Sequence, residues 1–324
     1  MKVCIYGAGA IGGWIGVKLA RAGCEVSVVA RGATLEAVQL HGLRLEENGK
    51  VDAVPARASA TPAELGEQDL VVVAVKAPSM PDVALAIGPL LGPRTVVLTA
   101  MNGVPWWFFE GFGGRFAGTR LKAVDPEGVI AAAIPPRHIV GCVVHASCLV
   151  KSPGLVQHHF GNKLIVGEPS GEKTARVREL AALLEKGGHE VVISEQIQKD
   201  AWYKLWGNMT VNPVSAFTGA TTDLILNDDL VRGFISSVML EAREIGARIG
   251  IPIDQSPEDR HQVTRRLGAF KTSMLQDVEA GKPVEIDALV TVVRELGELT
   301  GVPTPYTDVL LGLSRLHARV RGLY

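Results

Sequence analysis

The chain has 324 residues, of which 47% are hydrophobic, and this is typical of a globular protein of roughly two domains. Its acidic and basic residues are interspersed and give a net charge of −1, which argues against nucleic acid or a membrane surface as partner and leaves small neutral or anionic ligands. The four cysteines form no C-x-x-C pair, and the amino-terminal apolar run is too short and too rich in glycine for a signal sequence. We therefore expect a cytoplasmic protein.

Two styles of sequence follow one another along the chain. From Lys2 to about Ser194, short runs of β-branched residues alternate with helical patterns. This alternation is typical of parallel βαβ units with some additional antiparallel strands. After Glu195 the strand pattern stops. Long amphipathic helices are predicted over Ile197–Phe217, Asp228–Ile249, Pro257–Gly281 and Glu285–Gly301, and a last helix after PTPYTD. The pattern predicts an α/β domain over residues 1–195 and an all-helical domain over residues 196–324.

The first motif lies at the start of the chain, where Gly7, Ala8, Gly9, Ala10, Ile11 and Gly12 form a G-x-G-x-x-G sequence. It follows the predicted strand KVCIY and opens a helix that runs to about Ala22, as in one βαβ unit. The glycines allow a tight turn and close approach of the backbone to a pyrophosphate at the helix N-terminus. This context predicts a Rossmann-type dinucleotide-binding domain. The alternative is a glycine turn that packs strand against helix without a ligand.

Arg31 stands where the second strand of this unit ends. An NAD enzyme usually carries an acidic residue there, which binds the ribose hydroxyls. A guanidinium forms a charge-assisted pair with a 2′-phosphate instead, so NADP(H) is the predicted cofactor. The alternative is a solvated surface arginine, with Glu36 serving a ribose hydroxyl.

Lys76 and Asn102 follow two further predicted strands, DLVVVAV and RTVVLTA. In a doubly wound sheet, ligands bind at the carboxyl ends of the strands, so both would border the nicotinamide and its ribose. Either residue taken alone could be an ordinary polar strand end.

The helical half offers a row of polar side chains in the sequence YKLWGNMTVN. Lys204, Asn208 and Asn212 are four residues apart and share one helix edge. Ser273, Glu285 and Asp287 follow later in the chain. A lysine beside a carboxylate could protonate a carbonyl oxygen as hydride reaches its carbon, while amides and a hydroxyl hold the substrate. The alternative is a solvated helix edge.

GAGAIG, the strand-ending Lys76, the Asn102-Gly103 pair, KLWGNMTVNPVSAFTG and SMLQDVEAGKPVEID together resemble the ketopantoate reductase family, in that order and over essentially the whole chain. The resemblance implies an NADPH-dependent 2-dehydropantoate 2-reductase of pantothenate biosynthesis. It also implies that the helical domain is like that of 6-phosphogluconate dehydrogenases, with the site in the cleft between the domains.

The resemblance also implies a role for each site residue. Lys204 would be the general acid, and Glu285 would hydrogen-bond the substrate hydroxyl or the lysine. Asn208 and Asn212 would line the substrate pocket, and Ser273 would bind the substrate carboxylate. Asn102 would contact substrate and nicotinamide, and Arg31 and Lys76 would belong to the cofactor site.

The chain departs from the family pattern at three places. Phe270 and Thr222 stand where family members carry asparagines, and the segment after Asn102-Gly103 is longer and more aromatic, with Trp106, Trp107, Phe108 and Phe109 in succession. Fewer polar groups and more aromatic surface would suit a bulkier 2-keto acid. The aromatic cluster could equally be a packing feature or a contact in a homodimer.

Three hypotheses on function therefore stay open. They are ketopantoate reductase itself, a reductase or dehydrogenase of the same family for another 2-keto or 2-hydroxy acid, and a non-catalytic NADPH-binding sensor. The retained Lys204 and Glu285 count against the sensor. No metal is expected, because the histidines, including His158 and His159, show no ligand spacing. Besides its small-molecule substrate, the expected partner is a second copy bound through the helical domain.

Overall fold

The computed structural model describes residues 1–324, and the chain divides into two compact units. The first unit comprises residues 1–101 and 128–200, and the second comprises residues 102–127 and 201–324. The first domain predicted from the sequence, residues 1–195, includes residues 102–127, whereas in the structure these residues belong to the second unit. The reason is that Phe108, Phe109 and Phe116 of this segment pack into the core of the helical unit.

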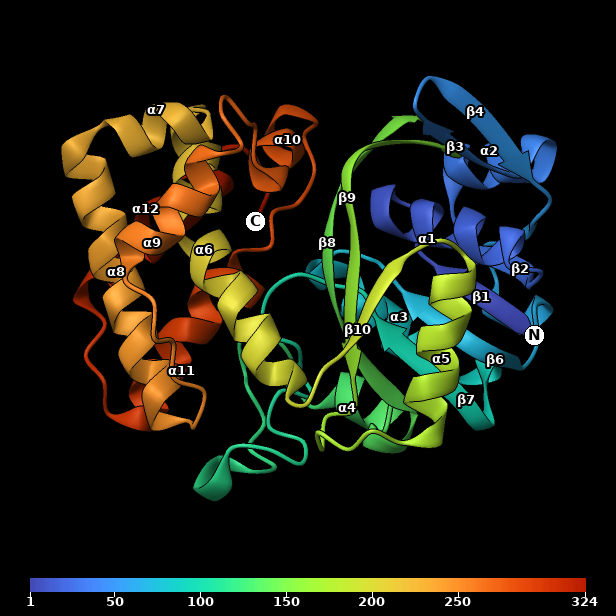
Figure 1. Ribbon diagram of the computed structural model, residues 1–324, viewed down its shortest axis with the longest axis horizontal. Helices are drawn as coiled ribbons and strands as arrows, with labels where there is room; N and C mark the ends of the chain where they lie inside the picture. Colours follow the sequence, from blue (N-terminus) through green and yellow to red (C-terminus); the bar gives the residue numbers. More distant parts are fainter. The chain divides into compact units, whose positions relative to one another are not determined.

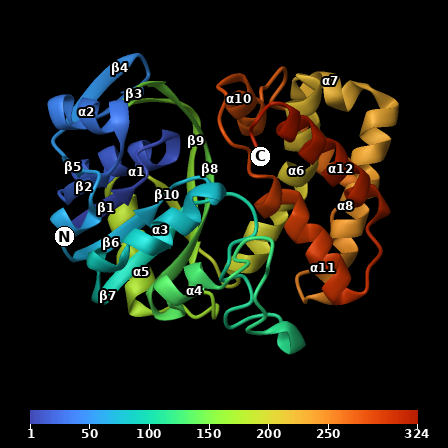
Figure 2. The ribbon, with the colours of Figure 1, turned by 180° about the vertical axis from the view of Figure 1, so that it is seen from behind.

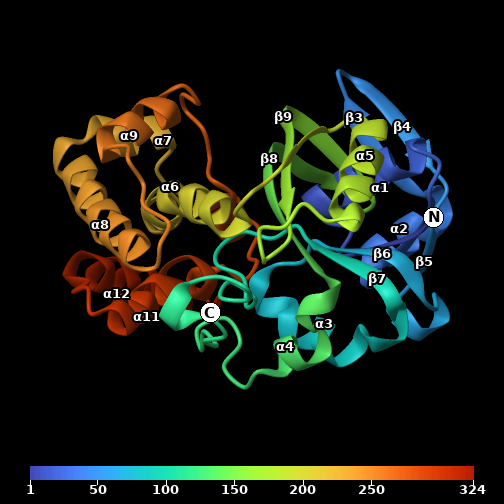
Figure 3. The same ribbon diagram turned by 60° about the horizontal axis from the view of Figure 1, so that its bottom comes forward.

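The first unit is built on one sheet of ten strands, in the order β4-β3-β9-β8-β7-β6-β1-β2-β5, with β10 paired to β9 (Figure 1). Only the β3–β4 and β8–β9 pairs are antiparallel, and Figure 3 shows the long strands β8 and β9 side by side. The α/β character and the antiparallel additions predicted from the sequence are thus confirmed. The strands are β1 Lys2–Tyr6, β2 Glu25–Val29, β3 Leu43–Glu47, β4 Lys50–Val54, β5 Arg57–Ser59, β6 Gln68–Val73, β7 Leu91–Thr99, β8 Ile139–Ser152, β9 Leu155–Gly167 and β10 Glu190–Ile193.

Helices cover both faces of this sheet. α1 and α5 lie on the face toward the viewer in Figure 1, and α3 lies on the opposite face, in front in Figure 2. The apolar side of α1 carries Trp14 and Ile15 into the core beside Ile5 of β1, because β-branched strand residues present a flat apolar surface to it. The helices of this unit are α1 Ala10–Arg21, α2 Gly32–His41, α3 Met80–Ala86, α4 Val129–Ala133 and α5 Ala175–Lys186.

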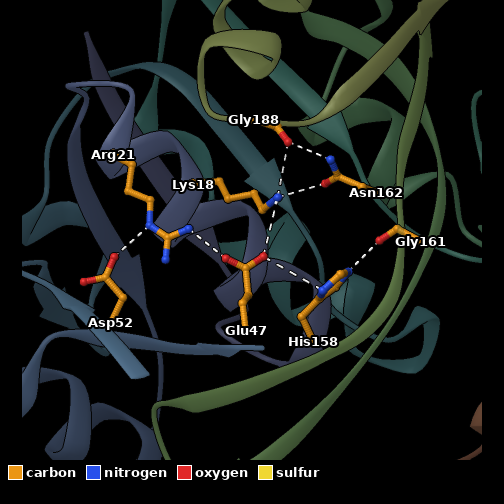
Figure 4. A network of polar contacts seen from close by, with 8 residues as sticks. All are labelled: Lys18, Arg21, Glu47, Asp52, His158, Gly161, Asn162 and Gly188. Atoms are coloured by element: carbon orange, nitrogen blue, oxygen red, sulfur yellow. Dashed lines mark hydrogen bonds and ion pairs between the residues drawn. The ribbon is translucent and has the colours of Figure 1, made fainter. Parts of the chain in front are cut away.

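An ionic network around the buried Lys18 fixes the C-terminal half of α1 (Figure 4). The Lys18 ammonium donates hydrogen bonds to Asn162 Oδ1 at 2.8 Å and to the Gly188 carbonyl at 3.3 Å, and it lies 3.6 Å from a carboxylate oxygen of Glu47. Arg21 pairs with the other oxygen of Glu47 at 2.8 Å. Since Lys18 is only 6% exposed, these contacts satisfy a charge that burial would otherwise make costly. They hold α1, which starts at the glycine motif, against β3 and β9.

The second unit contains helices and no strands, as the sequence predicts for residues 196–324. Its helices are α6 Ile197–Thr218, α7 Thr222–Asn227, α8 Asp229–Arg248, α9 Pro257–Arg265, α10 Ser273–Glu279, α11 Val292–Thr300 and α12 Pro305–Val320, with a π-helical turn η6 at Asp287–Thr291. α6, α8 and the η6–α11 segment coincide with predicted helices to within about two residues, the usual uncertainty of helix ends. The predicted last helix is present as α12, but it begins at Pro305, inside the PTPYTD sequence and four residues before the predicted start. None of the helices of the chain is long and apolar enough to span a bilayer.

The predicted helix Pro257–Gly281 is wrong, because residues 266–272 are not helical and separate α9 from α10. Gly268 has φ +65°, which ends the first helix, and Thr222 holds the connection. Its amide donates to the Phe270 carbonyl at 3.0 Å and its hydroxyl donates to the Gly268 carbonyl at 2.6 Å. Thr272 then caps α10 by accepting a hydrogen bond from the Leu275 amide. The two positions that depart from the family pattern, Thr222 and Phe270, are therefore paired through this connection.

The aromatic segment is a packing feature of the second unit. Phe108 and Phe109 are 0% and 1% exposed, and the Phe108 ring lies 6.1 Å from that of Trp202 on α6. Trp106 and Trp107 are buried as well. Side chains enclosed in this way offer no surface to a second copy of the chain. Of the alternatives that the sequence left open for this cluster, packing is the one that the burial of its aromatic rings supports.

Candidate functional site

The glycine motif forms a turn between β1 and α1 that has no room for a side chain at Gly7 or at Gly12. Gly7 has φ +97°, and a Cβ on Gly12 would lie 2.1 Å from the Gly7 carbonyl oxygen. At Gly9 the reverse holds, since a Cβ there would meet nothing within 4 Å. Gly9 is the N-cap of α1, with no capping side chain and no acidic residue in the first turn. The first amides of the helix, from Ala10 and Ile11 onward, therefore face an open position suited to a pyrophosphate.

Arg31 and Lys76 lie at the same edge of the sheet as this turn. Tyr6, the last residue of β1, is in register with Val29 of β2 and Val73 of β6, so the three strands end together. The strand order reverses between β1 and β6, which is where doubly wound sheets bind ligands. The Arg31 side chain is 69% exposed, and its only ion pair is with Asp82 at 3.3 Å. Because exposed pairs are weak, a ligand phosphate can replace that carboxylate.

In the second unit, α6 brings Lys204 to Asn102. The Lys204 ammonium donates a hydrogen bond of 2.8 Å to Asn102 Oδ1, although the two residues are 102 positions apart in sequence. Asn208 continues the same helix edge and is half-buried, as Lys204 is, whereas Asn212 is only 7% exposed. The row is therefore set into the unit and is not the solvated helix edge of the alternative interpretation.

Asn102 is held in place by its neighbours. Gly103 has φ +83°, and a Cβ there would lie 2.4 Å from the Ala288 carbonyl oxygen, so only glycine allows this approach. The Val104 amide then donates to the same carbonyl at 2.9 Å. Farther along, the Glu295 carboxylate accepts hydrogen bonds from the amides of Lys122 and Ala123 at 2.7 and 2.8 Å, which fixes the far end of the segment to α11.

Glu285 precedes the turn η6 that receives Gly103, and it is 6% exposed. A π-helical turn is rare and is frequently found at functional sites. Asp287 is used differently, since its Oδ1 accepts hydrogen bonds of 2.7 Å from both Thr291 and the Tyr324 hydroxyl. Burial, and then this carboxylate, raise the pKa of Tyr324 to about 12. Ser273 is the first residue of α10 and is exposed.

The chemistry available here is general acid catalysis. A lysine ammonium has three N–H donors, and Asn102 occupies one of them. An amide oxygen acceptor keeps the ammonium oriented without taking its proton, so the group can donate to a carbonyl oxygen. Sequence reasoning missed one feature beside this row, the guanidinium of Arg260 packed on Gly207 of α6. Its only signal in the sequence is a glycine inside a predicted helix.

Comparison with known proteins identifies the family of the chain. The sequence model described as ketopantoate reductase PanE/ApbA matches residues 3–171, and the C-terminal model of the same family matches residues 196–318. A 2-dehydropantoate 2-reductase of Mesorhizobium japonicum is 48% identical over 325 residues, covering 100% of both chains. A solved structure from Ralstonia solanacearum MolK2, assigned to the ketopantoate reductases, is 58% identical with a TM-score of 0.96, and covers 100% of this chain and 99% of that one.

More distant relatives share the fold. D-mandelate dehydrogenase, solved with NADH and anilino(oxo)acetate, superposes with a TM-score of 0.85 at 22% identity and covers 100% of both chains. Two family models that account for most of the chain, together with the full-length relative at 48% identity, decide the assignment. The chain belongs to the ketopantoate reductase family and is an oxidoreductase whose cofactor is NADP(H).

Proposed function

We propose that the protein catalyses the NADPH-dependent reduction of 2-dehydropantoate to pantoate, in pantothenate and coenzyme A biosynthesis, with Lys204 as general acid. The observation that carries the proposal is the hydrogen bond between Lys204 and Asn102. It joins two residues from distant parts of the sequence into a proton donor and its orienting group. The 48% identity to a 2-dehydropantoate 2-reductase supports the substrate.

The first unit would hold the cofactor. The amides at the start of α1 receive the pyrophosphate, Arg31 pairs with the 2′-phosphate, and Lys76 binds the neighbouring polar groups of the cofactor. When bound, NADPH supplies the hydride that is added to the carbonyl carbon of the substrate. Asn102 would also contact the nicotinamide of the cofactor. It would do so through its amide nitrogen, because its hydrogen bond with Lys204 uses only the amide oxygen.

The second unit would hold the 2-keto acid and supply the proton. Lys204 gives its proton to the carbonyl oxygen as the carbon accepts hydride, so that the ketone becomes a secondary alcohol and the ammonium becomes an amine. Asn208 and Asn212 hydrogen-bond the substrate, and Ser273 binds its carboxylate. The buried Glu285 hydrogen-bonds the new hydroxyl or the lysine.

A screen of NADPH oxidation against a panel of 2-keto acids tests the proposal. The highest kcat/KM is expected for 2-dehydropantoate. A higher value for a bulkier 2-keto acid would favour the related-reductase hypothesis, to which Phe270 and Thr222 point. Absence of turnover with every acid, alongside tight NADPH binding, would favour the sensor.

The proposal includes a homodimer formed through the helical unit. α12 exposes Tyr306, Val309, Leu313, Leu316 and Val320 at spacings of three and four residues, and each is 48% exposed or more. An apolar stripe of this period is what a pair of packed helices requires. Light scattering should give the mass of a dimer for the wild type and of a monomer for Leu316→Glu. A monomeric wild type would contradict this part.

We further place the protein in the cytoplasm. None of its four cysteines forms a disulfide, which fits a reducing compartment.

A further inference from the structure

Arg260 of α9 lies flat against the backbone of α6. A Cβ built on Gly207 would be 2.7 Å from its Nη2, 2.8 Å from its Nε and 3.0 Å from its Cζ. The Cζ atom also lies 5.5 Å from the centre of the Tyr203 ring, one helical turn earlier on α6. A guanidinium can approach a helix this closely only where the helix has no side chain, so Gly207 and Tyr203 form a seat for it.

This cation has no anionic partner in the protein. The Arg260 side chain is half-buried, forms no ion pair and no hydrogen bond, and its Nε is enclosed without an acceptor. The acids of its own helix are used elsewhere, Glu258 by Arg265 and Asp259 by the cap residue Ser256. Burial lowers the pKa of Arg260, and the Tyr203 hydroxyl is the only group that opposes this shift. Partial burial of an unpaired charge is costly, and a bound anion removes that cost.

The seat lies beside the proposed proton donor. Gly207 is three residues after Lys204 and directly before Asn208, so the three positions share one turn of α6. An anion bound by Arg260 would therefore lie next to the row of Lys204, Asn208 and Asn212, which is proposed to bind the 2-keto acid and protonate its carbonyl oxygen. A planar guanidinium recognises a carboxylate through two parallel hydrogen bonds, which a serine hydroxyl cannot provide.

We propose that Arg260, seated on Gly207 and Tyr203, binds the carboxylate of the 2-keto acid and is a specificity-determining residue for anionic substrates. The inference rests on the proposed function, and it adds a residue to it. Arg260 supplies the positive charge that selects the acid over its neutral analogues, and Ser273 is left with a supplementary hydrogen bond. No electron or proton is transferred by Arg260 itself.

The test compares 2-dehydropantoate with its neutral methyl ester. Arg260→Met should lower kcat/KM for the acid by about 10- to 100-fold, mainly through KM, because a charge-assisted pair is lost. The same variant should change kcat/KM for the ester by less than about threefold, since the ester offers no carboxylate to pair. Arg265→Met is the matched control, because Arg265 lies on the same helix but is paired with Glu258. Equal losses for acid and ester, or no loss for either, would overturn the proposal.

A second variant, Gly207→Ala, displaces the Arg260 guanidinium but keeps its charge. In Gly207→Ala the new methyl group would occupy the position that the guanidinium now contacts, so the KM for the acid should rise while the ester is unaffected. Alanine is a better helix former than glycine, so a general loss of folding is not expected. An unchanged KM for the acid in this variant would contradict the role of the seat.

A separate binding experiment distinguishes failure of the proposed reductase function from failure of the carboxylate site. Calorimetric titration with pantoate needs no turnover, and Arg260→Met should weaken its binding by about 10- to 100-fold. If the wild type reduces no 2-keto acid but pantoate binding still depends on Arg260, the reductase assignment fails and the carboxylate site stands. If pantoate binds equally well to both proteins, or to neither, the carboxylate site fails whatever the turnover screen shows.

Discussion

His189 makes the stability of the first unit sensitive to acid. It lies between α5 and β10, is 5% exposed, and meets the Trp14 ring edge-on with 4.5 Å between ring centres. Neither of its ring nitrogens has a hydrogen-bond partner. Burial, and then the charges of Lys18 and His158, lower the pKa of His189 from 6.5 to about 3. The folded protein therefore keeps this ring neutral at pH values where the unfolded chain protonates it.

The magnitude follows from proton linkage. Between the unfolded pKa of 6.5 and the folded pKa of about 3, the unfolded chain binds the additional proton, so stability is complete above pH 6.5 and is lost as the pH falls. From about pH 8 to about pH 5 the loss from this one group is RT ln(1 + 10^1.5), or about 2 kcal/mol. This is a large share of the net stability of a domain.

Urea unfolding of the wild type and of His189→Phe, at about pH 8 and about pH 5, isolates this contribution. Phenylalanine keeps an aromatic ring against Trp14 but cannot titrate. The wild type should lose about 2 kcal/mol more than the variant over this interval, because all other titrating groups cancel in the difference. His41→Phe, at an exposed position of α2, should behave as the wild type does. If His189→Phe loses as much stability as the wild type, the account of this buried ring is incorrect.

Two further predictions concern the cofactor site and the aromatic segment. Arg31→Ala should weaken NADPH binding by roughly 1.5 to 3 kcal/mol in calorimetric titrations and change NADH binding little, because only NADPH carries the 2′-phosphate. Equal losses for the two cofactors would remove Arg31 from that role. Phe108→Ala should lower the free energy of unfolding by about 3 to 5 kcal/mol, since it empties a fully buried site. A loss below about 1 kcal/mol in urea unfolding would show that the ring is not part of the core.

Local patterns predicted the arrangement of those candidate site residues that lie within a single element. The glycine motif is predictable because a strand, a tight turn and a helix impose their own spacing, and the structure has all three at Lys2–Arg21. The row of Lys204, Asn208 and Asn212 is predictable because helical periodicity places these residues on one edge. In both cases the relevant geometry spans fewer than about 25 residues.

Features that depend on distant contacts could not be predicted in this way. Residues 102–127 belong to the helical unit because Phe108 packs on Trp202 and because Glu295 accepts hydrogen bonds from the backbone of this segment. Neither contact can be predicted from a local sequence pattern. The break after α9 depends on hydrogen bonds from Thr222, more than 40 residues earlier in the chain. The seat of Arg260 likewise needs two helices to meet, and the sequence shows only the glycine that permits it.

The role of Lys204 is tested most directly by Lys204→Ala in steady-state reduction of 2-dehydropantoate, combined with titration of NADPH. General acid catalysis contributes about 10²- to 10⁴-fold, so kcat should fall by that factor while NADPH affinity stays nearly unchanged. In the wild type, reduction should also decline as the pH rises through the pKa of the lysine, and this limb should be absent from the profile of the variant. A variant that keeps near wild-type kcat and the same pH profile would contradict the account, and the contact between Lys204 and Asn102 would then be structural.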